Sequence, residues 1–248
     1  MISSLKKHLG IKDSLYILKK ESRGIASKKP IKKDEIIISI PDKFLLIGKK
    51  IPYYSKIKGS HQKNSIFAYF LYQESKKGKN SDWYFYIKTF PSRESVFKTF
   101  PFFLEENIIK EIKNTTFAKE LKKYKKEIKE DFNRLEEYFK ENINWKEYIY
   151  FRLLVTSRIF SYRNILYMVP YIDLMNHSIE SNSRWYYKKG YFQLQAIRDI
   201  PPKEEIVDSY GHVSNLYLYL YYGFTLPQKY KSKKFSYLKN EDLKNILR

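Results

Sequence analysis

The apolar residues of this 248-residue chain change their spacing twice along the sequence. Short runs rich in Ile and Leu, interrupted by Gly24, Pro30 and Pro41, fill the first fifty residues and are typical of β-strands. From about residue 60 the apolar residues recur three or four positions apart, which indicates helices, and after residue 165 the strand-like runs return. Because a doubly wound sheet would alternate strands and helices throughout, this order favours a β-rich domain with a large helical insertion.

The helical block contains three segments with a distinct apolar pattern. Residues 117–142 carry a stripe spaced for one helix face, and we expect this stripe to pack in the core. The members of the stripe are Leu121, Tyr124, Ile128, Phe132, Leu135 and Phe139. Residues 66–71 predict an earlier helix that breaks at Gly78, and residues 145–161 are apolar nearly all round, as expected for a helix buried inside a domain.

The returning strands are expected at residues 165–170, 183–189 and 191–197, with Lys189 and Gly190 in a hairpin turn. These patterns divide the chain into an N-terminal β-rich part, a helical insertion, a C-terminal β-rich part and a polar tail. The corresponding ranges are 1–50, 51–164, 165–227 and 228–248.

The last part of the chain predicts one more short helix at residues 213–224, capped by Ser214 or Asn215. The tail beyond it is polar, as in a partly disordered segment or a lone C-terminal helix.

The chain is strongly basic, with 48 Lys and Arg against 27 Asp and Glu and a net charge of +21. Such a charge attracts nucleic acid, anionic membranes or acidic proteins. The lysines, however, are spread from Lys6 to Lys244 rather than gathered into one patch. The charge therefore has two open interpretations, a binding footprint for nucleic acid and a general property of the composition.

No cysteine is present, which excludes disulfides and thiolate zinc sites. His8, His61, His177 and His212 lie far apart in sequence without ligand spacing, and no metal site is expected. No run approaches the roughly 18 apolar residues of a membrane span, and the N-terminus lacks the apolar core of a signal peptide. We therefore expect a soluble intracellular protein of the cytoplasm or the nucleus, with no membrane contact.

Motifs for several common reactions are absent. None of the 8 glycines stands one residue from another, which excludes the dinucleotide fingerprint and the phosphate-binding P-loop. A nucleophile elbow is absent as well. Hydride transfer, phosphoryl transfer and serine hydrolysis therefore have no support in the sequence.

Asn176 and His177 stand side by side in DLMNHS, and an isolated pair of this kind commonly satisfies backbone groups in a turn. Here it is one of five motifs that follow in order. The others are ESRGIASKKPIKKDEIIISIP, SDWYFYIKTFP, TSRIFS, and EEIVDSYG followed by SNLYLYLYYGF. From about residue 14 to residue 228, these motifs resemble the SET-domain methyltransferases, and specifically the Rubisco large-subunit methyltransferase-like branch.

The resemblance implies an α+β SET fold with small twisted β-sheets and a C-terminal segment threaded like a pseudoknot beneath the site. Residues 1–50 and 165–227 would form the SET core, and residues 51–164 would form the helical insertion. The resemblance also implies S-adenosylmethionine as the methyl donor, without a metal.

Several cofactor-binding residues follow from the same resemblance. Main-chain groups of Glu21 and Arg23, beside Gly24, would contact the cofactor. Arg158 would bind the carboxylate of the donor, a role suited to a planar guanidinium.

The DLMNHS and YYGF motifs would supply the remaining cofactor contacts. Asp173 would line the cleft, and Asn176 and His177 would bind the amino group and the adenine. Phe224 would stack near the adenine.

The resemblance makes Tyr210 the catalytic residue, with its phenol beside the methyl group as it passes to a lysine amine. The amine must be neutral to attack although its free pKa is about 10.4, and burial in an apolar channel lowers that pKa. Phe160 and Tyr222 would form walls of this channel, which Ile172 and Asp208 would also line.

Three positions depart from the pattern of the family. Ser22 stands in place of the first glycine of the opening motif, and Lys203 in place of a glycine before the acidic pair. Asp208 stands where an aliphatic residue or Asn is commoner. Of the three, Asp208 is the one expected to alter the mouth of the substrate channel.

The predicted function is protein-lysine N-methylation. Protein-histidine N-methylation is the alternative, because one member of the branch modifies imidazole, but that member carries Asn and Trp where this chain has Phe160 and Ile172. An aromatic wall suits the aliphatic stem of lysine better, so lysine is preferred. A non-catalytic SET-like binding module is the remaining alternative, and the presence of Arg158 and Tyr210 together with the Asn-His pair argues against it.

The expected partner is a protein that carries a target lysine, such as a histone, a ribosomal protein or another abundant protein. We expect the enzyme to act as a monomer, and nucleic acid stays a second partner class through the basic surface.

Overall fold

A computed structural model describes residues 2–19, 23–57, 62–211 and 213–227. Its contacts divide the chain into two compact units, each built from three separate stretches of sequence. Unit 1 comprises the described residues of Met1–Ile51, Lys77–Phe90 and Arg158–His212. Unit 2 comprises the described residues of the intervening stretches, Pro52–Lys76, Pro91–Ser157 and Val213–Arg248.

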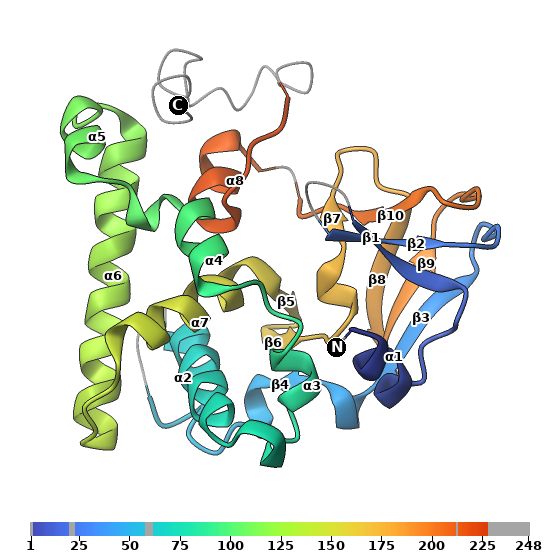
Figure 1. The fold of residues 1–248 in the computed structure, drawn as a ribbon, viewed down its shortest axis with the longest axis horizontal. Coiled ribbons are helices and arrows are strands. Elements are labelled where there is room, and N and C mark those ends of the chain that lie inside the picture. Colours follow the sequence, from blue (N-terminus) through green and yellow to red (C-terminus); the bar gives the residue numbers. More distant parts are fainter. Residues whose placement is uncertain (1, 20–22, 58–61, 212, 228–248) are drawn as a thin grey trace. The chain divides into compact units, whose positions relative to one another are not determined.

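Unit 1 holds the strands and several short helices, which Figure 1 labels along the chain. In chain order its elements are α1 (Ile2–Leu9), β1 (Leu15–Lys19), β2 (Arg23–Ser27), β3 (Ile36–Pro41), η1 (Asp42–Phe44), β4 (Leu46–Ile47), η2 (Gly48–Lys50), η3 (Gly78–Asn80), α3 (Tyr84–Ile87), β5 (Ile159–Tyr162), β6 (Ile165–Met168), η5 (Ile172–Leu174), β7 (Asn176–His177), β8 (Ser183–Lys188), β9 (Tyr191–Ala196) and β10 (Glu205–Asp208). The η elements are short 3₁₀ helices.

Unit 2 is helical in its described residues, and α6 is its longest helix (Figure 1). Its elements are α2 (Gln62–Lys76), α4 (Arg93–Thr99), η4 (Pro101–Phe103), α5 (Glu106–Glu111), α6 (Thr116–Phe139), α7 (Trp145–Arg158), whose last residue counts with unit 1, and α8 (Asn215–Tyr222).

The strands of unit 1 form three small sheets. Their orders are β1-β2-β10-β7, β3-β9-β8 and β4-β6-β5. In the first sheet β10 lies between two strands that are distant in sequence, antiparallel to β2 and parallel to β7. The buried side chains of Ile25 and Ile206, both fully inaccessible, are paired across β2 and β10, so the two ends of the SET-like sequence share one apolar core.

The segment between β7 and β8 follows β10 closely. Asn182 is completely buried, and its amide nitrogen donates to the Glu205 carbonyl at 2.8 Å while its amide oxygen accepts from the Val207 amide at 2.9 Å. The Ser183 hydroxyl also donates to the Val207 carbonyl at 2.8 Å. These side-chain bonds take the place of backbone ladder bonds and hold strand β10 against Asn182 and Ser183.

The predicted hairpin between β8 and β9 is confirmed. Lys189 and Gly190 have φ values of 48° and 79°, as a two-residue turn with a left-handed backbone requires. Trp185 of β8 and Phe192 of β9 stack with ring centroids 5.0 Å apart, which ties the two strands together on one face.

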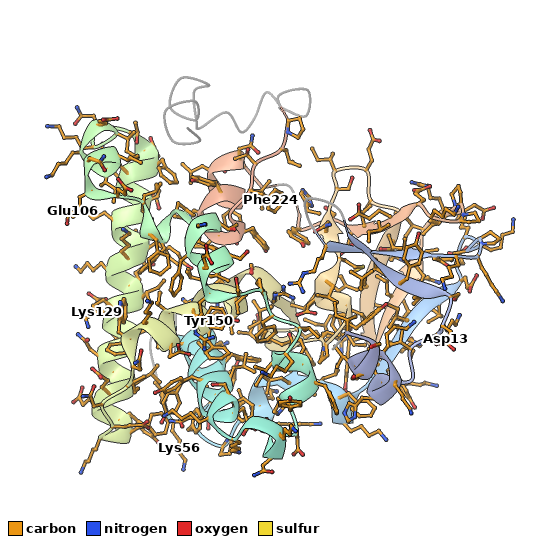
Figure 2. All side chains as sticks on the ribbon, in the orientation of Figure 1. Asp13, Lys56, Glu106, Lys129, Tyr150 and Phe224 are labelled. Carbon is orange, nitrogen blue, oxygen red and sulfur yellow. The ribbon has the colours of Figure 1, made fainter. Side chains whose placement is uncertain are left out.

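The predicted helices of unit 2 are present with shifted ends. The apolar stripe of α6 is buried from Leu121 to Leu135, and Phe139 stacks on Tyr69 of α2 at 4.2 Å. The helix ends at Phe139 rather than at residue 142, because Lys140 adopts a left-handed φ of 50°. The exposed Lys129, labelled in Figure 2, borders this stripe, and its Nζ lies 4.6 Å from the ring centroid of Phe132.

The buried helix expected at 145–161 is shorter than predicted. Helix α7 ends at Arg158, because residues 159–162 pair with β6 as strand β5. Apolar composition alone did not distinguish the end of this helix from the start of the strand. The short helix α8 begins at the predicted cap, where the Ser214 hydroxyl accepts a hydrogen bond from the Tyr217 amide at 3.1 Å.

Some elements lack a clear pattern in the sequence, among them α1, α3 and the two-residue strand β7. Residues 77–90 lie within the expected insertion in sequence, yet they belong to unit 1 with the strands. Within the described ranges, no helix combines the length and the apolar character needed to cross a membrane.

Candidate active site

Tyr210 lies just after β10 and is held by residues of the β7 segment. Its amide donates to Nδ1 of His177 at 3.0 Å, and its hydroxyl donates to the Met175 carbonyl at 2.7 Å. The two rings stack with centroids 5.0 Å apart and an interplanar angle of 29°. The parallel pairing of Asp208 with His177 produces this arrangement, because the chain that continues from β10 must pass the DLMNHS segment.

The protonation state of His177 follows from these contacts. Burial lowers the pKa of His177 below its ordinary value of 6.5, although a hydrogen bond with the Asp208 backbone opposes this. In the neutral ring Nδ1 is the acceptor for the Tyr210 amide, so the proton resides on Nε2. Because the folded pKa is lowered, this group contributes stability above pH 6.5 that is lost as the pH falls.

A buried ion pair lies in the same unit. Nη1 of Arg158 is 3.0 Å from Oδ2 of Asp173, and the Tyr86 hydroxyl donates to that same oxygen at 2.6 Å. Burial acts to lower the pKa of Arg158, but the charge and hydrogen bond of Asp173, together with smaller contributions from Tyr86 and Tyr210, outweigh it and raise the pKa above its ordinary value. The guanidinium also lies 5.5 Å from the ring centroid of Phe90.

This pair is incompletely satisfied by the described residues. Oδ1 of Asp173 is buried without a hydrogen-bond partner, and only Nη1 of Arg158 makes hydrogen bonds to residues in the described ranges. A buried acceptor without a donor costs stability. Two guanidinium nitrogens and one buried carboxylate oxygen are therefore left without a hydrogen-bond partner among the described residues.

The opening motif meets the end of the SET-like segment at Gly24. A Cβ at this glycine would lie 2.1 Å from Oε1 of Glu205, and that oxygen accepts a 2.6 Å hydrogen bond from Nδ2 of Asn176. Gly24 therefore leaves the space that the Glu205 carboxylate occupies. The neighbouring Arg23 donates from Nη1 to the Thr89 carbonyl at 2.7 Å.

We expect Gly24→Ala to displace the Glu205 carboxylate and break its bond to Asn176, at a cost of about 1 kcal/mol in the free energy of unfolding. Urea denaturation measures this change in the free energy of unfolding. In a Glu205→Ala background the same substitution should be nearly neutral, because the atom that it meets is gone. Equal losses in the two backgrounds would contradict this explanation of Gly24.

Asp208 ends β10 and is 7% exposed. Burial raises the pKa of its carboxyl from 3.8 to about 6, and a hydrogen bond from the Ser209 backbone opposes the shift. The unfolded state therefore releases this proton at lower pH than the folded state. The free energy of unfolding therefore falls as the pH rises from 3.8 to about 6, because the carboxyl must ionise in a buried position. Above that range the loss is complete and no longer changes with pH.

We expect Asp208→Asn to stabilise the fold at pH 8 by on the order of 3 kcal/mol, because each pH unit between the two pKa values contributes about 1.4 kcal/mol. The advantage should vanish near pH 3.8, where the carboxyl is protonated in both states. The exposed Asp13, labelled in Figure 2, offers Asp13→Asn as a control for the same substitution at an exposed position. A pH-independent difference for Asp208→Asn would contradict the burial argument.

The predicted channel residues lie in both units. In unit 1, Phe160 is half-buried with its ring 5.4 Å from Trp185 and 5.1 Å from Phe192, whereas Ile172 is fully buried in η5. In unit 2, Tyr222 ends α8 and its ring is 6.3 Å from Phe224 (Figure 2).

The channel and adenine roles of these residues stay predictions. The predicted contribution of Glu21 falls outside the described residues.

Three groups make contacts in this site that the sequence did not reveal. The motif SDWYFYIKTFP was recognised, but nothing in it distinguished Tyr86 as the partner of Asp173. Glu205 belongs to the acidic run before Tyr210, and this run was the available signal for its bond to Asn176. The Met175 carbonyl has no side-chain signature. Over the described ranges, no group of three or more His, Cys, Asp or Glu residues could hold a metal ion.

The architecture and the site agree with one family of known domains. The SET domain matches this chain over residues 22–211, which is more than half of its length. The chain belongs to the SET-domain family. The match begins just before Gly24 and ends just after Tyr210, so it includes most of the site residues described above.

Solved SET structures share the fold. The SET domain of LSMT bound to lysine and AdoHcy superposes with a TM-score of 0.76 at 20% identity, and LSMT bound to MeLysine and AdoHcy with 0.77 at 21%. Each covers 92% of this chain, which in turn covers 56% of each solved chain. The likeness establishes the SET fold and confirms that prediction.

Curated SET relatives match a shorter segment. Ribosomal lysine N-methyltransferase 1 of Saccharomyces cerevisiae is 33% identical over 63 residues, and SET domain-containing protein 8 of Schizosaccharomyces pombe is 39% identical over 62. N-lysine methyltransferase SETD6 of Bos taurus is 37% identical over 60 residues. The matched segments are 24–25% of this chain and 11–14% of the relatives' length.

Proposed function

We propose that this protein transfers a methyl group from S-adenosylmethionine to the ε-amine of a lysine in a protein substrate. The observation that carries the proposal is the incompletely satisfied pair of Arg158 and Asp173. The family of the chain and the names of its lysine methyltransferase relatives support the same reaction.

The pair fits the amino-acid end of the proposed donor. That end carries an α-carboxylate and an α-ammonium group. The remaining Arg158 nitrogens can donate to a carboxylate, and the planar guanidinium suits its geometry. Oδ1 of Asp173 lacks a donor among the described residues and can accept from the ammonium group. A zwitterion would therefore satisfy both partners, whereas a simple anion would leave the Asp173 oxygen without a donor.

The remaining cofactor contacts are assigned by resemblance. Asn176 and His177 bind the amino group and the adenine. The bond from Asn176 to Glu205 orients the amide, which supports a binding role for this side chain. The backbone of Arg23 completes the described part of the proposed site, and Glu21 lies outside the described residues.

Tyr210 acts on the reacting groups. When bound, the donor supplies a methyl group on a positively charged sulfur. The Tyr210 hydroxyl directs its proton to the Met175 carbonyl, so its oxygen acts as an acceptor toward a further group. An electron-rich oxygen in a fixed position stabilises positive charge beside it without reorganisation, which supports a catalytic role.

The acceptor amine must lose its proton before or during binding. By resemblance, Phe160 lines the lysine channel, where an aromatic wall favours the neutral amine and guides the four-carbon stem of lysine. Imidazole would gain more from a polar partner for its second ring nitrogen, and Phe160 offers none. Lysine is therefore proposed over histidine. The solved LSMT complexes with lysine and MeLysine support this choice.

The identity of the substrate protein and the location of the reaction go beyond this conclusion. From the sequence alone, we also propose that the substrate is an abundant protein with an accessible lysine. The enzyme would act as a monomer, in the cytoplasm or the nucleus. The net charge of +21 supports an acidic or nucleic-acid-bound substrate equally.

The test is methylation of cell extract with tritiated S-adenosylmethionine in the presence of a metal chelator. Mass spectrometry of the labelled band should identify methyl-lysine. Methyl-histidine without methyl-lysine would establish the alternative acceptor. Calorimetry with the chelated protein should detect donor binding, and its absence up to millimolar donor with folded protein would contradict the whole proposal.

A further inference from the structure

Tyr86 lies in α3 of unit 1 and is 2% exposed. Its ring packs edge-to-face on Phe90 at 4.8 Å and lies 6.3 Å from Trp83. Its hydroxyl donates to Oδ2 of Asp173 at 2.6 Å across a sequence separation of 87 residues. Burial and the neighbouring Asp173 charge raise the pKa of Tyr86 well above its ordinary value, so the hydroxyl keeps its proton.

The bond falls on the oxygen that also holds Arg158. Oδ2 of Asp173 receives both the Tyr86 hydroxyl and Nη1 of Arg158, while Oδ1 has no described partner. Two donors on one oxygen fix the rotation of the carboxylate about its bond to Cβ. The carboxylate is thereby held against the guanidinium, and Oδ1 stays buried without a described partner.

Resting on the proposed function, we propose that Tyr86 is a positioning residue for the methyl donor. Its hydroxyl holds Asp173, and Asp173 holds Arg158 in the orientation that receives the α-carboxylate of the donor. Tyr86 itself does not touch the donor in this arrangement. Its effect is therefore confined to ligands that carry the amino-acid end.

A purely structural role for the Tyr86 hydroxyl makes a different prediction. A buried phenol needs a hydrogen-bond partner in any case, and its removal would then weaken the fold without regard to the ligand. Two nucleosides separate these roles. S-adenosylhomocysteine carries the amino-acid end, whereas 5′-methylthioadenosine has the same nucleoside and thioether without it.

The experiment measures the dissociation constants of both nucleosides by calorimetry for the wild type and for Tyr86→Phe. We expect Tyr86→Phe to weaken S-adenosylhomocysteine binding about tenfold, as for loss of a hydrogen bond to a charged group, and to leave 5′-methylthioadenosine binding unchanged. Asp173→Asn should show the same selectivity, because it weakens the hold on Arg158 directly.

Tyr69→Phe is the matched control in unit 2. Tyr69 is 4% exposed, and its hydroxyl donates to Oε2 of Glu141 at 2.6 Å, so the substitution removes a tyrosine–carboxylate bond of the same length, together with the bond that the hydroxyl accepts from Gln73 at 2.7 Å. Its thermal unfolding gives the stability loss expected from removing a buried tyrosine hydroxyl in the other unit. For Tyr69→Phe, the ratio of the dissociation constants of S-adenosylhomocysteine and 5′-methylthioadenosine should match the ratio in the wild type.

The outcomes separate this inference from the proposed function. Suppose that the wild type binds S-adenosylhomocysteine, but that Tyr86→Phe weakens the binding of both nucleosides equally or leaves both unchanged. The positioning role is then wrong, and the proposed function stands. If the folded wild type binds neither nucleoside, the proposed function fails and the positioning role fails with it.

Discussion

Tyr210→Phe is expected to lower the rate of methyl transfer by about 100-fold or more, the loss typical of removing one preorganised polar group from a reacting centre. The substitution keeps the ring that stacks on His177 and the amide that donates to it, and removes only the hydroxyl bonded to Met175. The dissociation constant of S-adenosylmethionine should therefore change little. Single-turnover transfer of labelled methyl and calorimetry measure the two quantities on the same preparation.

The control is Tyr191→Phe, at a tyrosine of β9 that is 46% exposed. Its rate should equal that of the wild type. A loss of donor binding as large as the loss of rate in Tyr210→Phe would show that Tyr210 holds the structure rather than the reacting groups.

Arg158→Met is expected to destabilise the protein by about 3–5 kcal/mol, because it leaves the Asp173 carboxylate buried without its cationic partner. The Asp173 side chain has no exposed surface, and that of Arg158 is 12% exposed, so water screens the pair poorly. Donor binding should be lost together with the stability. Guanidinium chloride denaturation measures the free energy of unfolding.

The double variant Arg158→Met with Asp173→Asn tests the cause. Removing the carboxylate charge should return part of the lost stability, because the remaining amide needs no counter-charge, and donor binding should stay absent. If the double variant is less stable than Arg158→Met alone, the loss arises from packing around residue 158 instead of from an unpaired charge.

The apolar spacing of the sequence determined the main elements. It predicted α2, most of α6 and α7, the β8–β9 hairpin and the cap of α8 at Ser214. These features depend on residues within a few positions of one another, which is why a pattern in the sequence suffices. The ends of the helices depend on contacts outside the helix. Helix α7 stops at Arg158 and β5 follows, because strand pairing with β6 outweighs the helical preference of an apolar run.

The motifs also predicted the family, which is confirmed, and they proposed the principal site residues, including Arg158, Asp173 and Tyr210. Resemblance named these residues without giving their mutual contacts. It assigned Arg158 and Asp173 separately to the cofactor, and the structure joins them in one ion pair. It likewise offered no account of Gly24 as the space for a carboxylate.

Only the tertiary structure decided the contacts between distant segments. Tyr86 meets Asp173 across 87 positions, and Asn176 meets Glu205 across 29. Neither pair has a local periodicity, since the partners come together only when β10 inserts between β2 and β7 and residues 77–90 join the strands. A charged or polar group that is buried loses its hydrogen bonds to water, so it needs a partner within the protein. The fold, and not the local sequence, decides which residue that partner is.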